Sequence, residues 1–451
     1  MNPAVEFGRR LRVLAFHALL LCAAGCGGTD ENDPDTLPKR EKPARNVILL
    51  IGDGMGPAQL TLARIAGPGV HEGLALEKTP FVGLVKTYPA GTMLVTDSAA
   101  AATAFACARK TTNGTLGESP DGTDYENLTE WCRKRKKSVG LVTTASVTHA
   151  TPAAFAVHCP DRNKEADVAQ EYLGAGVDIL FGGGLQYFPE TRQAAFREAG
   201  YGFVRSRQEL LGAERAPLIG LFADRFMDFE IDRPREVQPS LEEMAMKAIQ
   251  ILSRDEDGFF LMIEGGRIDM ACHGHDAATM VRDVVAFDLA VQYAVAFAER
   301  DGNTLVLVTA DHSTGGLAIG EQVSVDRLRG RTASAERMRE LTVRGNRPLP
   351  DVVREHAGFE VTDRMLAQIE ALKAVGDPKY SLHNAIADVL SRAAGVTFIP
   401  LDVQATHLVT KGHDGCDVPL FAWGPRAADF TGVLDNTEVG ARIRRAMEAG
   451  K

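Results

Sequence analysis

Carboxylate and imidazole side chains recur in this sequence where short apolar runs begin or end. The residues are Asp53, Glu264, Asp269, His273, Asp311, His312 and His413. Carboxylate oxygens together with imidazole nitrogens suit zinc, whereas oxygen ligands alone suit magnesium. Each cluster alone is weak evidence, because an Asp-Gly pair after a strand is usually a turn and a single histidine is usually a hydrogen-bonded structural residue. The repetition of the clusters predicts a site for divalent metal ions.

A serine with a second kind of chemistry precedes a run of alanines. Asp97 and Ser98 stand directly before Ala99–Ala102, and either of them would cap a helix that the alanines propagate. The helix dipole and free backbone N–H groups favour negative charge there, so Ser98 is a candidate nucleophile as well as a candidate cap. The sequence has no Gly-x-Ser-x-Gly elbow around Ser98 and no Walker motif, which disfavours an α/β-hydrolase triad and a P-loop enzyme.

Apolar runs that alternate with helical stretches must position these polar clusters. The predicted strands are Asn46–Ile51, Ser138–Thr143, Val177–Phe181, Phe259–Ile263, Thr304–Val308 and Val418–Trp423. The predicted helices are Pro57–Ile65, Thr123–Lys136, Ser240–Ser253 and Ala277–Arg300. Continuous apolar strands alternating with helices are typical of a parallel sheet covered on both faces. The pattern therefore predicts an α/β fold, a three-layer sandwich around a large, mostly parallel central sheet, with ligands bound at the carboxyl edge.

Length and composition exclude several classes of protein. The chain has 451 residues, of which 45% are hydrophobic and 24% charged, so it is neither disordered as a whole nor fibrous. The formal net charge of −10 disfavours a general nucleic-acid binder, and we expect no nucleic-acid partner. Seven cysteines in this length do not make a disulfide scaffold.

The N-terminal residues have the pattern of a targeting segment. Three arginines within residues 9–12 overlap the start of the mostly apolar run Leu11–Gly25, which is too short to span a bilayer. The run ends in Ala23-Ala24-Gly25-Cys26, which resembles a bacterial lipoprotein cleavage site. We therefore predict a lipoprotein-type signal peptide at residues 1–25, lipidation of Cys26, and a flexible tether at residues 26–43. The alternative is an ordinary signal peptide cut nearby, which leaves Cys26 free. Both predict export to the periplasm or cell envelope, and the lipoprotein prediction adds membrane contact only through a lipid anchor.

Six segments, in this order, resemble the alkaline phosphatase family. They are Ile51–Gly56, Thr96–Ala100, His149–Ala153, Glu264–Asp269, Thr309–Ser313 and His413–Val418. Six motifs in the right order are far more specific than any one of them. The resemblance covers roughly Ala44 to Trp423. It implies a catalytic domain at residues 44–451 with a crown-like insertion at about 320–405, and an exported homodimer.

The resemblance also implies a role for each matching residue. Asp269, His273 and His413 match the ligands of one zinc ion, and Asp53, Asp311 and His312 match those of a second. Asp53, Thr151 and Glu264 match the ligands of a magnesium ion, beside which His149 stands where some members carry Asp. Ser98 matches the nucleophile and Arg162 the arginine that grips the phosphate.

These residue types suit the hydrolysis of phosphate monoesters to alcohol and inorganic phosphate. Two close cations neutralise the phosphate dianion and hold both the attacking and the leaving oxygen, and a guanidinium fork binds two further oxygens. The implied reaction passes through a phosphoserine at Ser98. A phosphodiesterase or sulfatase on the same scaffold is one alternative, although the Cys/Ser-x-Pro-x-Arg context of sulfatases is absent around Ser98. A non-catalytic surface lipoprotein that binds metal or phosphate is another.

Three residues near the matched motifs have open roles. Met270 stands where many family members place a charged or hydrogen-bonding residue near the phosphate, and we expect it to serve in packing. His275 and Asp276 follow His273 closely. They either orient the metal ligands or lie in a solvated loop.

Overall fold

The computed structural model describes residues 42–374, 381–407, 409–410 and 412–448. The residues from Lys42 onward form one unit. The predicted signal peptide, Cys26 and all but the last two residues of the predicted tether lie outside the described residues. None of the helices in the described ranges is long and apolar enough to cross a membrane.

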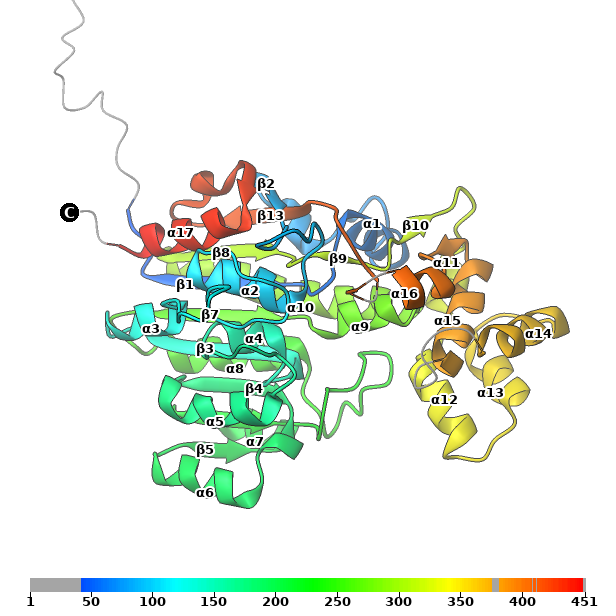
Figure 1. Ribbon diagram of the computed structural model, residues 1–451, viewed down its shortest axis with the longest axis horizontal. Coiled ribbons are helices and arrows are strands. Elements are labelled where there is room, and N and C mark those ends of the chain that lie inside the picture. Colours follow the sequence, from blue (N-terminus) through cyan, green and yellow to red (C-terminus); the bar gives the residue numbers. More distant parts are fainter. Residues whose placement is uncertain (1–41, 375–380, 408, 411, 449–451) are drawn as a thin grey trace, which may run out of the picture. The chain divides into compact units, whose positions relative to one another are not determined.

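A ten-stranded sheet forms the centre of the unit, with the strand order β14-β2-β13-β8-β1-β7-β3-β4-β6-β5 (Figure 1). Its strands are β1 (Asn46–Ile51), β2 (Phe81–Lys86), β3 (Ser138–Ser146), β4 (Ile179–Gly183), β5 (Gly202–Val204), β6 (Leu218–Leu221), β7 (Phe259–Glu264), β8 (Thr304–Thr309), β13 (Val418–Trp423) and β14 (Gly432–Asp435). Only β13 pairs antiparallel with its neighbours, β8 and β2. Two small antiparallel pairs join β9 (Ser313–Thr314) to β12 (His413–Asp414) and β10 (Ala318–Ile319) to β11 (Val396–Thr397).

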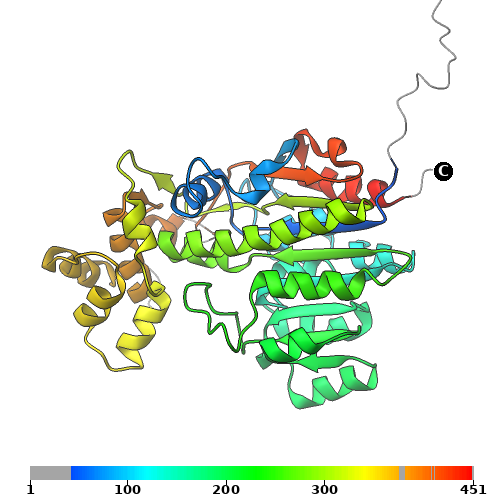
Figure 2. The same ribbon diagram turned by 180° about the vertical axis from the view of Figure 1, so that it is seen from behind.

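Helices cover both faces of the large sheet, as Figures 1 and 2 show from opposite sides. On one face lie α2 (Ser98–Cys107), α3 (Leu128–Arg133), α4 (Ala150–Ala154), α5 (Glu165–Ala175) and α17 (Asn436–Met447). On the other lie α1 (Pro57–Ala66), α8 (Leu241–Leu252) and α10 (Ala277–Asp301), preceded by the short α9 (Arg267–His273). The edge helices are α6 (Glu190–Glu198) and α7 (Arg207–Gly212), and three 3₁₀ turns lie at Ala75–Lys78, Leu185–Tyr187 and Ala427–Phe430. This arrangement confirms the predicted three-layer α/β fold.

The central strands are buried along their whole length, which explains why their sequences read as continuous apolar runs. Every residue of β1, β7 and β8 is buried, and β1 pairs in parallel with both of the others. Burial of each Val, Leu or Ile side chain contributes about 1.5–3 kcal/mol. The predicted strand positions agree with the structure to within a few residues.

The predicted helix Thr123–Lys136 is wrong in its extent. The helix α3 covers only Leu128–Arg133. Asn127 starts it with a capping box: its side chain accepts from Glu130 N at 3.0 Å, and the Glu130 carboxylate accepts from Asn127 N at 3.0 Å. The chain then leaves the helix, and Lys136 has a left-handed φ of 60°. Local capping therefore overrides the longer helical pattern.

Residues 320–405, which we call the insertion, lie between β10 and β12 and carry a second apolar core. Their helices are α11 (Val325–Arg329), α12 (Ala335–Val343), α13 (Leu349–His356), α14 (Asp363–Leu372), α15 (Ser381–Ala393) and most of α16 (Leu401–His407). The core between these helices includes Met338, Val352, Ile369 and Ile386. The insertion is coloured yellow to orange in Figure 1.

Candidate active site and metal centre

The predicted site residues meet at one edge of the sheet because of strand direction. Asp53, Glu264 and Asp311 stand at or just after the carboxyl ends of the parallel strands β1, β7 and β8. His413 precedes β13, whose antiparallel direction places its start at the same edge. The pairing of His413 with Thr314 in the small β12–β9 sheet fixes that position.

One group of potential metal ligands contains Asp269, His273 and His413. One ligand atom from each lies within 4.8 Å of the others, and the two Nε2 atoms of the histidines are 3.1 Å apart. His413 Nδ1 lies 2.9 Å from the carbonyl oxygen of Thr96, which accepts its proton. The His413 Nε2 lone pair therefore faces Asp269 and His273, as a metal ligand requires.

A second group surrounds His312 and includes Asp53 and Asp311. His312 Nε2 lies 3.5 Å from Asp53 Oδ1 and 3.2 Å from Asp311 Oδ2. Because Thr314 Oγ1 donates to Asp269 Oδ1 at 2.6 Å, it is free to accept from His312 Nδ1 at 3.1 Å. Burial lowers the pKa of His312 to about 4, so the ring is neutral with its Nε2 lone pair directed at the carboxylates.

The loop after β1 must approach this group closely, and Gly54 permits it. Gly54 has φ of 71°, and a Cβ there would lie 2.8 Å from both Asp269 Oδ1 and Thr314 Oγ1. Its backbone N donates to Asp311 Oδ1 at 3.1 Å. Glycine at this position permits both the left-handed backbone conformation and a close contact that a side chain would block.

Ser98 is the first residue of α2, and its hydroxyl is not used as the helix cap. Asp97 is the cap, since its carboxylate accepts from Ala100 N at 3.0 Å. The Ser98 Oγ instead lies 3.2 Å from His312 Nε2 and is buried with the second group. The sequence left two roles open for Ser98, helix cap and nucleophile. In the structure the cap is Asp97, not Ser98.

A third group contains Asp53, His149 and Glu264, with Thr151 on α4 beside it. One ligand atom from each of the first three lies within 4.8 Å of the others. Thr143, which the sequence reading did not select, donates to Glu264 Oε2. Thr143 ends a predicted strand, and this position could have marked it as a site residue.

The donor atoms of this cluster suit cations. Within the described residues, both carboxylate oxygens of Asp53, Glu264 Oε1 and Thr151 Oγ1 are buried without a hydrogen bond. Burial raises the pKa of Glu264 to about 7, and burial with the charge of Asp269 raises the pKa of Asp311 to about 7. Buried carboxylates without partners are costly unless a cation compensates them. The residues present therefore fit the divalent metal ions that the sequence predicts.

Arg162 connects the serine segment to the third group. Its Nη1 donates to Asp97 Oδ2 at 3.0 Å, and its Nη2 donates to His149 Nε2 at 3.1 Å. With Nε2 accepting, the proton of the neutral His149 ring is on Nδ1, which is buried without a hydrogen bond. A cation bound through either ring nitrogen would remove this acceptor from Arg162. Holding Arg162 and binding the third cation are therefore mutually exclusive roles of His149.

The remaining residues singled out from the sequence lie outside the three groups. His275 and Asp276 are buried and contact the insertion, so the solvated-loop alternative is wrong. Met270 is half-buried and packs against the apolar core, as predicted. Its Sδ also lies 3.0 Å from Arg267 Nη1.

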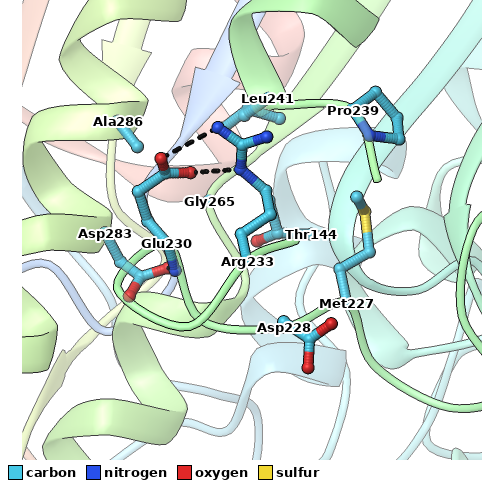
Figure 3. A pocket seen from close by; sticks show the side chains of 10 residues that line it. All are labelled: Thr144, Met227, Asp228, Glu230, Arg233, Pro239, Leu241, Gly265, Asp283 and Ala286. Atoms are coloured by element: carbon cyan, nitrogen blue, oxygen red, sulfur yellow. Dashed lines mark hydrogen bonds and ion pairs between the residues drawn. The ribbon is translucent and has the colours of Figure 1, made fainter. Parts of the chain in front are cut away.

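A small pocket lies beside the site (Figure 3). Its walls include Thr144 and Gly265, which directly follow Thr143 and Glu264, but none of the predicted site residues. The Arg233 guanidinium crosses it and donates to Glu230 at 2.7 and 3.0 Å. The pocket is thus separate from the metal-ligand groups.

The chain is similar to known proteins over most of its length. The sequence profile of the alkaline phosphatase family matches residues 44–449. The chain is 33% identical to alkaline phosphatase 3 of Bacillus subtilis, over 90% of this chain and 89% of the relative. The crystal structure of a cold-active alkaline phosphatase from a psychrophilic Shewanella species superposes with a TM-score of 0.81 and 30% identity, covering 89% of this chain and 100% of that one.

A third relative carries a bound metal. A histidine-to-glutamate mutant of the alkaline phosphatase of the Antarctic bacterium TAB5 has Mg bound in a site called M3. It is 28% identical to this chain, with a TM-score of 0.67, over 91% of this chain and all of that one. The matched profile spans most of the sequence, and the similarity extends over nearly the whole length of these relatives. The chain therefore belongs to the alkaline phosphatase family.

Proposed function

We propose that this protein hydrolyses phosphate monoesters to alcohol and inorganic phosphate, with Ser98 as the nucleophile and a phosphoserine as the intermediate. The observation that carries the proposal is the position of the Ser98 hydroxyl. It lies 3.2 Å from His312 Nε2, and it does not cap the helix, because Asp97 does. At the first turn of α2, the helix dipole favours the negative charge that Ser98 carries as a nucleophile and that phosphate brings to it.

The three groups of ligands are proposed to hold two zinc ions and one magnesium ion. Zinc is assigned to Asp269, His273 and His413, and to Asp53, Asp311 and His312. Magnesium is assigned to Asp53, Thr151 and Glu264, with His149 alongside. Bound cations would lower the pKa of the serine hydroxyl and neutralise charge on the phosphate oxygens. The support is the donor chemistry, mixed oxygen and nitrogen in the first two groups and mainly oxygen in the third.

The chain's own residues orient the reaction. Asp97 and His149 hold the two ends of the Arg162 guanidinium, so its plane is fixed before substrate binds. A planar fork matches two oxygens of a phosphate, and its charge favours a dianion over a diester monoanion. The carbonyl of Thr96 and the hydroxyl of Thr314 fix the ring orientations of His413 and His312.

Three substrates with the same leaving group test the function: an aryl phosphate monoester, the corresponding diester and an aryl sulfate. We expect the monoester to be turned over fastest. Faster turnover of the diester or the sulfate would favour the alternative on the same scaffold. Absence of turnover in a fully metal-loaded protein would favour a non-catalytic binding protein.

Arg162→Lys should lower kcat/KM for the monoester about tenfold to a hundredfold. A lysine keeps the charge but loses the bidentate fork, and a hydrogen bond to a charged group contributes about 1.5–3 kcal/mol. Steady-state kinetics measures the change. Arg235→Lys is the control, since the Arg235 side chain is 74% exposed. Wild-type kcat/KM in Arg162→Lys would contradict the assignment.

We propose that the mature protein is exported and anchored through acyl chains on Cys26. The support is the small-residue segment before this cysteine and the polar stretch after it. The mature protein should partition into detergent and carry acyl mass on Cys26, with more than one chain needed for stable anchoring. Intact mass spectrometry that finds a different N-terminus and no lipid would contradict the anchor.

We further propose that the catalytic unit is a homodimer. Val82, Leu84 and Val433 are 53%, 42% and 61% exposed, and Leu84 lies opposite Val433 in the β2–β14 pair. A partner copy is expected to cover this apolar face. Leu84→Glu should shift sedimentation toward the monomer, whereas Val343→Glu, at another exposed valine, should not. Monomeric wild-type protein would contradict the proposal.

A further inference from the structure

The turn Gly274–Asp276 joins the ligand-bearing helix α9 to the long helix α10, and it is held from the insertion. Two of the three ligands of the first proposed zinc site, Asp269 and His273, lie on α9, which is only seven residues long. So short a helix has little stability of its own. Contacts that hold the C-terminal end of α9 therefore also determine the position of His273.

His275 is fully buried and occupies a strained backbone conformation. Its φ is 61°, in the left-handed region, which is unfavourable for a residue with a Cβ. The ring stacks on Phe398 with centroids 4.8 Å apart and an angle of 13° between planes. Interactions of the side chain must compensate for the strain.

Both ring nitrogens of His275 have partners on the insertion. Nδ1 lies 2.9 Å from Asp388 Oδ1 on α15, and Nε2 lies 2.6 Å from Gln404 Nε2 on α16. The carboxylate only accepts and the amide N–H only donates, so the pair selects the neutral tautomer with its proton on Nδ1. The ring therefore has one orientation in which both contacts are satisfied.

The backbone on either side of His275 is held by the same helix. Ser391 Oγ on α15 donates to the carbonyl of His275 at 2.7 Å and accepts from Ala277 N at 3.1 Å. Asn384 Nδ2 on α15 donates to the carbonyl of His273 itself at 3.3 Å. Figure 1 shows α15 and α16 beside the end of α9, in agreement with these hydrogen bonds.

Asp276 adds a buried link to the start of α12. Its carboxylate caps α10 by accepting from Thr279 N at 3.2 Å. It also accepts from Arg331 Nη2 at 3.2 Å and from Ala335 N at 2.8 Å. The turn is thereby connected to the start of α12 as well as to α15 and α16.

We propose that His275 is a positioning residue: it locks the end of α9 to the insertion and so sets the position of His273 in the first zinc site. The opposing ligand, His413, is oriented separately by the Thr96 carbonyl at 2.9 Å. Loss of the lock therefore moves His273 relative to His413 without moving His413. The inference rests on the proposed function only in taking Asp269, His273 and His413 as a zinc site.

The test is zinc binding by purified full-length protein, titrated against a chromogenic chelator. His275→Ala removes both ring contacts and leaves a Cβ at positive φ. His275→Asn tolerates that φ and keeps a donor in reach of Asp388. Gln404→Leu removes the contact of the insertion with His275 Nε2. It is the second variant to test if His275→Ala does not fold. Arg354→Ala, which breaks only a surface pair with Asp363, is the control.

In His275→Ala, one equivalent of zinc should bind at least about tenfold more weakly than in wild type, a typical loss when support of a metal ligand is removed. The second equivalent should be unchanged, His275→Asn should recover most of the loss, and excess zinc should restore turnover. Equal weakening of both equivalents, or unchanged binding in both His275→Ala and Gln404→Leu, would overturn the inference alone. A wild-type protein that binds no zinc would overturn the proposed function and this inference together.

Discussion

Ser98→Ala should lower turnover of a phosphate monoester by about a thousandfold or more while leaving metal content at the wild-type level. The hydroxyl is the proposed attacking group, and loss of a nucleophile costs several orders of magnitude. None of the proposed metal ligands is altered. Residual turnover is expected, because metal-activated water can attack phosphate directly. Steady-state kinetics with elemental analysis of the same sample measures both quantities.

The structure also predicts that this substitution leaves α2 intact, since Asp97 supplies the cap. Ser206→Ala is the matched control: Ser206 caps α7 through Glu209 N, so its loss should cost about 1 kcal/mol of stability with no change in turnover. If Ser98→Ala retained near-normal turnover, Ser98 would be a structural residue and water would be the direct nucleophile.

Removal of metal should abolish activity and also lower the midpoint of thermal unfolding. Without cations, both carboxylate oxygens of Asp53 and Oε1 of Glu264 are buried without a hydrogen bond in the described residues. A cation that binds only the folded state stabilises it by about 2.7 kcal/mol at a free concentration of 100 times Kd. Zinc together with magnesium should restore both activity and the unfolding midpoint.

The control for chelation is a chelator already saturated with zinc, which should change neither quantity. Calorimetry of metal-free and reconstituted protein gives the shift of the midpoint. Full activity in protein shown by elemental analysis to be metal-free would contradict the metal centre, and an unchanged midpoint would contradict the compensation of the buried carboxylates.

Burial explains which parts of the fold were predictable from the sequence. The strands β1, β7 and β8 are buried on both faces, so their apolar runs are continuous. β2 was not predicted, because alternate residues such as Val82 and Leu84 are exposed and Gly83 interrupts the run. β5 has only three residues, too few for a periodic pattern.

The site was predictable to the extent that it follows from strand ends and from the family resemblance. Asp53, Glu264 and Asp311 end parallel strands, and that rule places them together. His413 joins them only because β13 runs antiparallel, which no local pattern reveals. The contact of Arg162 with His149 depends on side-chain geometry in the folded state.

The contacts of the turn after α9 were likewise beyond the sequence. His275 meets Asp388 across 113 residues of chain, and Gln404 across 129. Such pairs form only once the insertion has packed against the sheet domain. Their residue types, a histidine, a carboxylate and an amide, do not select one another among the many polar residues of the chain.

Acid quenching can trap the proposed phosphoserine at residue 98. Wild-type enzyme is mixed with a radiolabelled phosphate monoester, quenched at mildly acidic pH within the first turnovers, digested and sequenced by mass spectrometry. We expect label on the peptide that contains Ser98, no label in Ser98→Ala, and retention of configuration at phosphorus because two in-line transfers occur. Inversion at phosphorus with no labelled peptide would show that water attacks the substrate directly and that Ser98 is not the nucleophile.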